Sequence, residues 1–212
     1  MREAENIREV EALDIDLMGF IFWPKSSRYV NERPAYLPTQ CKRVGVFVNA
    51  RIEEIMQKVQ DYALDAIQLH GHESPDYIRQ LGSVCGDSIA IIKAFNIATT
   101  EDLEATKPYE GIVDYFLFDT KGKSVGGNGE KFDWSVLSDY VGETPFLLSG
   151  GIGPDDAERV KSFLTSHLSP LTSHLSSLTS HKCIGIDLNS RFETAPAIKD
   201  AAVLSRFLSQ FH

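Results

Sequence analysis

Short apolar runs alternate with amphipathic stretches along most of the chain. Each run is apolar along its length, as expected of a strand that is buried on both faces of a parallel sheet. The stretches between the runs carry apolar residues three and four positions apart, which indicates helices with one buried face. The first five runs recur every 22 to 26 residues and begin near Met18, Val44, Ala66, Ala90 and Val113. This alternation predicts a parallel α/β sheet with right-handed crossovers.

The same pattern extends to both ends of the chain. Further apolar runs at 146–151 and 184–188 predict two more strands, and the pattern predicts helices at 2–13 and at 195–211. Pro75 and Pro154 each precede an aspartate, which is typical of the first turn of a helix.

Polar residues or glycines follow the carboxyl end of every predicted strand. Because these ends converge at one mouth in a closed barrel, they favour a (β/α)8 TIM barrel over an open, doubly wound sheet. A single barrel domain is expected over residues 1–212. The residues at the strand ends include Lys25, Arg28, Asn49, His70, Asn96, Asp119, Ser149, Gly150, Gly151, Asp187, Asn189 and Ser190.

Composition and charge exclude several classes of function. The chain is 42% apolar and 24% charged, and its net charge of −9 argues against a nucleic-acid partner. Its three cysteines lie far apart and suggest neither a disulfide framework nor a metal site. The charged N-terminus does not resemble a signal peptide, and no apolar stretch approaches the roughly 20 residues of a membrane span. We therefore expect a cytoplasmic protein with no membrane partner.

A repeat interrupts the pattern at 165–181, before the last predicted strand. Two seven-residue copies and the start of a third place His167, His174 and His181 seven residues apart. A metal site is one interpretation. A low-complexity expansion between a helix and a strand is favoured, because residues seven apart lie two helical turns apart and no carboxylate stands between them.

Three candidate sites stand out. Asp119 ends an aromatic strand directly before a glycine-rich basic loop at 121–129, which is typical of a carboxyl group delivered to a substrate loop, although an ordinary strand end fits as well. Gly150 and Gly151, with the loop at 187–190, fit the phosphate site formed after the last two strands of many barrels. Arg28 suits a substrate carboxylate and His70 could orient a substrate group, with surface or turn positions as alternatives.

Together these segments resemble the phosphoribosylanthranilate isomerase family. Outside the repeat, the resemblance runs from Met1 to the C-terminus. Six segments carry it in order, at 19–29 (GFIFWPKSSRY), 43–49 (RVGVFVN), 68–71 (QLHG), 118–120 (FDT), 126–134 (GGNGEKFDW) and 148–152 (LSGGI).

The resemblance implies an Amadori rearrangement in tryptophan biosynthesis, without a cofactor or metal. The substrate would be the small molecule N-(5-phosphoribosyl)anthranilate, and the protein a monomer or homodimer. By match to the family's motif, Asp119 would be the general acid and Arg28 would bind the anthranilate carboxylate. Gly150, Gly151 and the loop at 187–190 would hold the phosphate.

The sequence departs from the family at its start. The family's first strand ends in Cys-Gly, and its cysteine is the general base, whereas Met1 resembles the residue after that pair. Cys41, Cys85 and Cys183 are all expected toward the opposite mouth, so none replaces it. We expect a strand of roughly six to eight residues to be missing through a start assigned too late.

Two other interpretations stay open. The chain could be a non-catalytic phosphosugar-binding barrel or an inactive fragment, because loss of a general base typically costs about 10²–10⁴-fold in rate. A related barrel, indole-glycerol-phosphate synthase, is disfavoured because neither its catalytic lysine nor its long N-terminal helix is recognisable.

Overall fold

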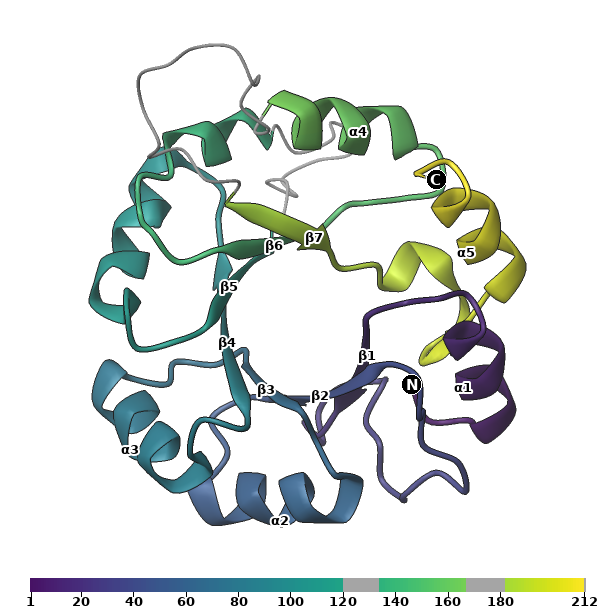
Figure 1. Cartoon of the computed structure of the whole chain (residues 1–212), viewed down its shortest axis with the longest axis horizontal. Helices are drawn as coiled ribbons and strands as arrows, with labels where there is room; N and C mark the ends of the chain where they lie inside the picture. The colour runs from purple at the N-terminus through teal and green to yellow at the C-terminus, as the bar shows by residue number, and fades with distance from the viewer. Residues whose placement is uncertain (120–133, 167–181, 212) are drawn as a thin grey trace.

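A single parallel sheet organises the molecule. The computed structural model describes residues 1–119, 134–166 and 182–211. In these ranges the sheet contains β1 (Leu17–Ile21), β2 (Lys42–Phe47), β3 (Ala66–Leu69), β4 (Ala90–Asn96), β5 (Tyr115–Asp119), β6 (Phe146–Ser149) and β7 (Cys183–Ile186). The strands pair in chain order, and Figure 1 shows them curled into a ring. A doubly wound sheet would reverse its strand order, so the barrel-type curl predicted from the sequence is confirmed.

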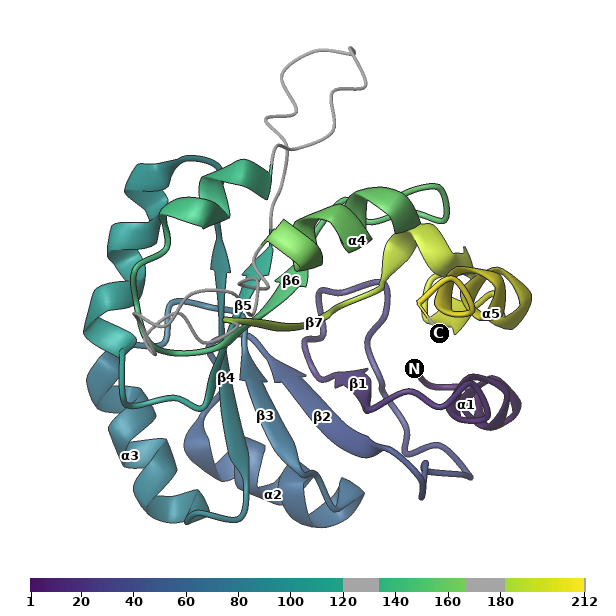
Figure 2. The same cartoon turned by 45° about the horizontal axis from the view of Figure 1, so that its top comes forward.

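The helices cover the outside of this ring, as Figures 1 and 2 show. No helix in the described ranges is long and apolar enough to cross a membrane. The α-helices are α1 (Ala4–Glu11), α2 (Ile52–Tyr62), α3 (Pro75–Cys85), α4 (Ala157–Ser166) and α5 (Ala201–Leu208). The described residues also form three 3₁₀ helices: η1 (Thr100–Tyr109), η2 (Trp134–Asp139) and η3 (Ser190–Phe192).

The core has two parts, one on each face of the sheet. On β5 the side chains of Phe116 and Phe118 join the larger cluster, which also includes residues of the helices, and Leu117 joins the smaller one. Because successive side chains of a strand point to opposite faces, the smaller cluster fills the inside of the ring. Its buried members are Val44, Ala66, Ile92, Ala94 and Leu117.

The helix predicted at 195–211 is wrong at its start. The strands β8 (Glu193–Ala195) and β9 (Ile198–Lys199) form an antiparallel hairpin there, and α5 begins only at Ala201. Proline fixes its own φ and lacks an N–H, so Pro196 suits the turn, where Ala197 has a φ of 69°. Asp200 then caps α5 by accepting a hydrogen bond of 3.0 Å from the backbone N–H of Val203.

The two ends of the sheet are β1 and β7, which share no ladder in the described part of the chain. The outer edge of β1 is partly covered, because Met1 N lies 2.7 Å from Gly19 O and Val30 N lies 2.9 Å from Ile21 O.

Candidate active site

The carboxyl ends of β4, β5 and β6 bring the predicted acid to one rim of the ring. Asp119 is the ladder partner of Asn96 on β4 and of Ser149 on β6. Ser149 Oγ donates a hydrogen bond of 2.8 Å to Asp187 Oδ2, just beyond β7. The structure therefore gathers Asp119, Ser149 and Asp187 at the same end of the sheet, with Asp119 half-buried.

The predicted phosphate loop follows β6. Gly150 and Gly151 have φ values of 84° and 70°, a region in which residues with a Cβ are strained. The loop continues to Asp156, which is 1% exposed and accepts a 2.8 Å hydrogen bond from Gly153 N. α4 begins at Ala157, directly after Asp156, and not at Pro154 as predicted.

Arg191, which was not among the predicted site residues, also lies beside this loop. A β-carbon placed on Gly153 would lie 3.0 Å from Arg191 Cδ and 3.3 Å from its Nη1. The exposed arginine therefore runs across the Cα of Gly153, next to the predicted phosphate ligand Ser190. Its position directly after the predicted phosphate-binding loop at 187–190 could have indicated this role from the sequence.

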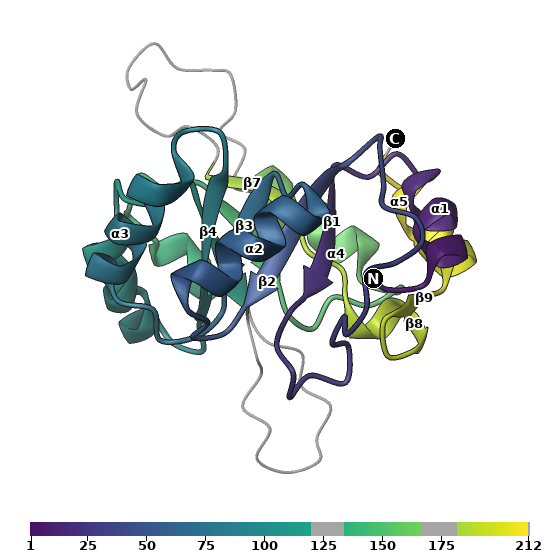
Figure 3. The same cartoon turned by 90° about the horizontal axis from the view of Figure 1, so that it is seen from below.

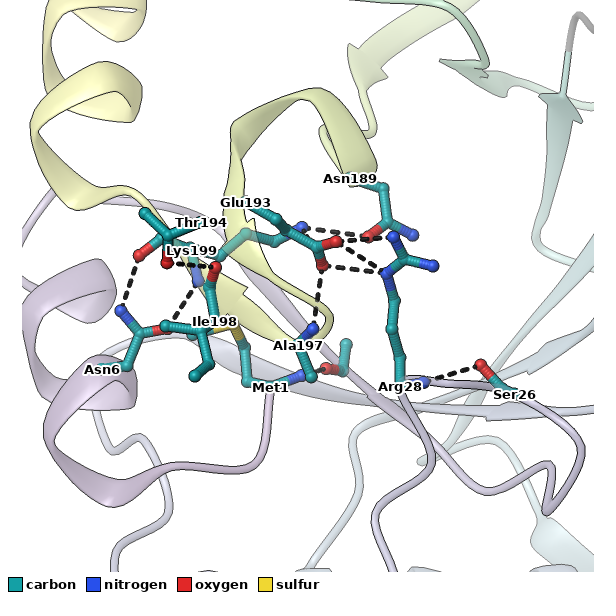
Figure 4. A network of polar contacts seen from close by, with 11 residues as sticks. Met1, Asn6, Ser26, Arg28, Asn189, Glu193, Thr194, Ala197, Ile198 and Lys199 are labelled. Atoms are coloured by element: carbon teal, nitrogen blue, oxygen red, sulfur yellow. Dashed lines mark hydrogen bonds and ion pairs between the residues drawn. The ribbon is translucent and has the colours of Figure 1, made fainter.

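Arg28 belongs to a cluster of charges that Figure 4 shows in close-up. Its Nε lies 2.9 Å from both carboxylate oxygens of Glu193, and its Nη2 lies 2.6 Å from Oε2. Lys199 Nζ lies 3.3 Å from Glu193 Oε1 and 3.0 Å from the predicted ligand Asn189 at Oδ1. With two cations and one carboxylate, Arg28, Lys199 and Glu193 carry a net charge of +1.

Burial and charge act against each other at Glu193. Burial alone would raise the pKa of this carboxyl, but the hydrogen bond from Arg28 and the charge of Lys199 outweigh it and hold the pKa below its ordinary value. Burial lowers the pKa of Lys199, and the attraction of Glu193 opposes this only in part. No pattern along the chain pointed to Glu193, which lies 165 residues from Arg28.

His70 directly follows β3, in a loop that the buried ion pair of Lys93 and Glu73 contacts. Its backbone N–H donates 2.8 Å to Phe47 O on β2. Glu73 accepts hydrogen bonds from the backbone N–H groups of Gly71 and Asn49 and lies 3.1 Å from Lys93 Nζ. The structure thus places His70 at the carboxyl end of its strand, as predicted. It also shows that Lys93 and Glu73 bind the backbone of the next residue, Gly71.

The three thiols lie toward the amino ends of the strands, as predicted. Cys41 directly precedes β2, Cys183 begins β7, and Cys85 ends α3. Burial raises the pKa of Cys41 and of Cys183 to about 11, and also raises that of Cys85. These thiols are therefore unsuited to act as bases at the rim that holds Asp119.

Across the described residues, no group of three His, Cys, Asp or Glu side chains is arranged to hold a metal ion. The histidine repeat proposed as a possible metal site, and the glycine-rich loop after Asp119, lie largely or wholly outside these residues.

Fold and site together define an α/β-barrel enzyme with its polar groups at the carboxyl ends of the strands. Comparison with known proteins gives the particular family. Residues 1–210 match the family described as N-(5'phosphoribosyl)anthranilate (PRA) isomerase, and the chain belongs to this family of isomerases of tryptophan biosynthesis.

Individual relatives agree with this assignment. The chain is 47% identical to N-(5'-phosphoribosyl)anthranilate isomerase of Phocaeicola vulgatus, over 99% of this chain and 94% of that protein. It is also 47% identical to the isomerase of Parabacteroides distasonis, over 99% and 90%. Among solved structures, the Thermotoga maritima isomerase superposes with a TM-score of 0.74 at 28% identity, over 99% and 94%. A further isomerase structure holds reduced 1-(o-carboxyphenylamino)-1-deoxyribulose 5-phosphate and has a TM-score of 0.72 at 25% identity, over 99% and 97%.

Proposed function

We propose that this chain rearranges N-(5-phosphoribosyl)anthranilate to 1-(2-carboxyphenylamino)-1-deoxyribulose 5-phosphate, with Asp119 as the general acid. The supporting observation is that one rim of the sheet gathers a half-buried carboxyl group, a loop with two glycines of positive φ and a cluster with a net charge of +1. A substrate with a phosphate at one end and a carboxylate at the other needs such groups.

Asp119 would start the reaction. Its carboxyl proton passes to the furanose ring oxygen as the bond from that oxygen to C1 breaks, and the nitrogen lone pair forms a protonated Schiff base. A base then removes the proton from C2, which gives an enolamine. A proton is added at C1 while the C2 hydroxyl loses its proton, and this yields the ketone. Substrate and product are isomers, so no oxidant or reductant is consumed.

The remaining roles concern binding. We assign the anthranilate carboxylate to Arg28 and the phosphate to the backbone N–H groups of Gly150 and Gly151, which precede α4. Ser149, Asp187, Asn189 and Ser190 would complete the substrate site, with His70 at its rim. Arg191 would add a cation at the phosphate, in a chain whose net charge is −9.

Location and assembly are part of the same proposal. A cytoplasmic location fits an enzyme of amino-acid biosynthesis, and we retain monomer or homodimer as the expected states. Monomers generated from the dimeric isomerase of Thermotoga maritima have also been solved.

The test combines turnover with binding. Wild-type protein should convert the fluorescent substrate. Asp119→Asn should lose about 10²–10⁴-fold in kcat, because the amide cannot donate the carboxyl proton. The variant should still bind the reduced product analogue with a Kd close to that of the wild type. Unchanged turnover in Asp119→Asn would contradict the assigned acid. Binding without turnover in the wild type would favour the alternative, a non-catalytic phosphosugar-binding barrel.

A further inference from the structure

We propose that Glu193 is a positioning residue that fixes the guanidinium of Arg28, leaving one edge of that group for the carboxylate of the substrate. This inference rests on the proposed function, because it assumes that Arg28 meets a carboxylate. It adds a residue that neither the motifs nor the strand ends indicated.

The hydrogen bonds show which edge is used. A guanidinium presents five N–H groups along fixed edges and can hold one carboxylate on each of two edges. Glu193 takes the edge formed by Nε and Nη2, at 2.6–2.9 Å. The structure shows no hydrogen bond from Nη1 to any described residue, and the Arg28 side chain is 25% exposed. In Figure 4 the guanidinium lies against the carboxylate with its other end directed away.

Glu193 is itself held in place. Its side chain is only 4% exposed, and its Oε1 lies 3.3 Å from both Ala197 N and Lys199 Nζ. The hairpin that carries it lies beside α1 and α5, as Figure 3 shows. Asn6 of α1 exchanges two hydrogen bonds of 2.8 Å with the backbone of Lys199. Arg28 therefore rests on a support with few degrees of freedom, and a preorganised side chain loses less entropy when it binds.

Charge explains why the cluster has three members. An isolated pair of Arg28 and Glu193 would be neutral and would attract a substrate carboxylate weakly. Lys199 restores a net charge of +1 while it keeps contact with Glu193. The cluster thus combines a fixed orientation with an attraction for anions.

The experiment measures the Kd of two ligands for the wild-type protein and for one variant, Glu193→Gln. The first is the reduced product analogue, and the second is the same molecule without its carboxyl group. Charged hydrogen bonds contribute about 1.5–3 kcal/mol, so wild-type protein should prefer the first ligand by roughly 10- to 100-fold in Kd. In Glu193→Gln one of the two acceptor oxygens is replaced by an NH2 donor, so the side chain can no longer accept from Nε and Nη2 together, and the fixed orientation is lost. The preference should fall below about threefold, while the Kd of the carboxyl-free ligand stays nearly constant.

Glu110→Gln is the matched control. Glu110 also accepts hydrogen bonds from several partners, including Tyr140 Oη at 2.7 Å and Thr144 N at 2.9 Å, but it has no part in the proposed site. This variant should keep the wild-type preference even if it is less stable. Such a result would separate positioning of Arg28 from a general effect of losing a partly buried carboxylate.

A second variant covers the case in which Glu193→Gln does not fold. Arg28→Lys should lose the preference to the same extent, and adding Glu193→Asp in that background should change it no further. A folded Glu193→Gln protein with the full wild-type preference would overturn the inference. Equal binding of both ligands by wild-type protein that turns over substrate would overturn the inference alone. Wild-type protein that neither binds nor turns over would overturn the proposed function as well.

Discussion

The buried pair of Lys93 and Glu73 predicts a large loss of stability when its cation alone is removed. The two side chains are 3% and 1% exposed, and Lys93 Nζ lies 3.1 Å from Glu73 Oε2. Lys93 Nζ also approaches three carbonyl oxygens, those of Leu69, Gly71 and Ala94, at 2.8–3.3 Å. Lys93→Met removes all of these contacts and leaves the Glu73 carboxylate buried without its counter-charge.

The magnitude follows from this asymmetry. Removing one partner of a buried ion pair typically costs about 3–5 kcal/mol, and we expect this cost for Lys93→Met. Glu73→Gln should cost less, about 1–3 kcal/mol, because Lys93 keeps its three carbonyl acceptors. The double variant contains no unpaired charge and should cost less than the sum of the two single changes.

Urea denaturation at pH 7, followed by circular dichroism and by tryptophan fluorescence, measures these differences. The m-values should stay constant across the variants, so that midpoints report stability. A loss below about 1 kcal/mol for Lys93→Met, or additivity in the double variant, would refute the reasoning.

Three further predictions concern other parts of the molecule. Arg191→Met should raise the Kd for a phosphorylated ligand by about tenfold and leave the Kd for a dephosphorylated ligand unchanged. Arg206→Met on α5 is the control. Equal effects of these two substitutions would exclude a phosphate contact by Arg191. Glu11 accepts hydrogen bonds from Tyr36, Thr39 and Gln40, which outweigh burial and hold its pKa below the ordinary 4.5. The stability it provides should be complete above pH 4.5 and be lost as the pH falls through the folded-state pKa, so Glu11→Gln should destabilise the protein at pH 6 more than at pH 3 in urea titrations. At pH 8, iodoacetamide should alkylate Cys41 and Cys183 at least about 100-fold more slowly in the native than in the unfolded protein, since a thiol with a pKa near 11 is almost wholly protonated; mass spectrometry would detect rapid native alkylation if this is wrong.

The strands were predictable because a strand that is buried on both faces is apolar along its whole length. A run such as Tyr115–Asp119 is apolar until its end, and the carboxyl ends of parallel strands must meet at one rim. Asp119, Ser149 and Asp187 could therefore be assigned to one site without knowledge of their contacts. The helix at 195–211 was mispredicted because Ile198, which lies in β9, happens to continue the helical spacing of Ala201, Leu204 and Leu208 in α5.

The charged partners were not predictable to the same degree. Lys93 did carry a signal, since a lysine within an otherwise apolar strand must find a buried partner, but the sequence does not say which one. Glu193 carried none. Its contact with Arg28 depends on how the two ends of the sheet approach each other, which no local pattern records.

The pairing of Arg28 with Glu193 also bears on the order in which the molecule folds. Neighbouring strands join segments that are close in sequence, whereas this pair closes a loop of 165 residues. The entropy lost in closing such a loop corresponds to about 4–5 kcal/mol beyond a constant, so the contact is expected to form after the sheet has brought its ends together. A ligand that binds both to Arg28 and to the loop after β6 would reduce the freedom of those ends, and it should slow the unfolding of the chain as well as occupy the site.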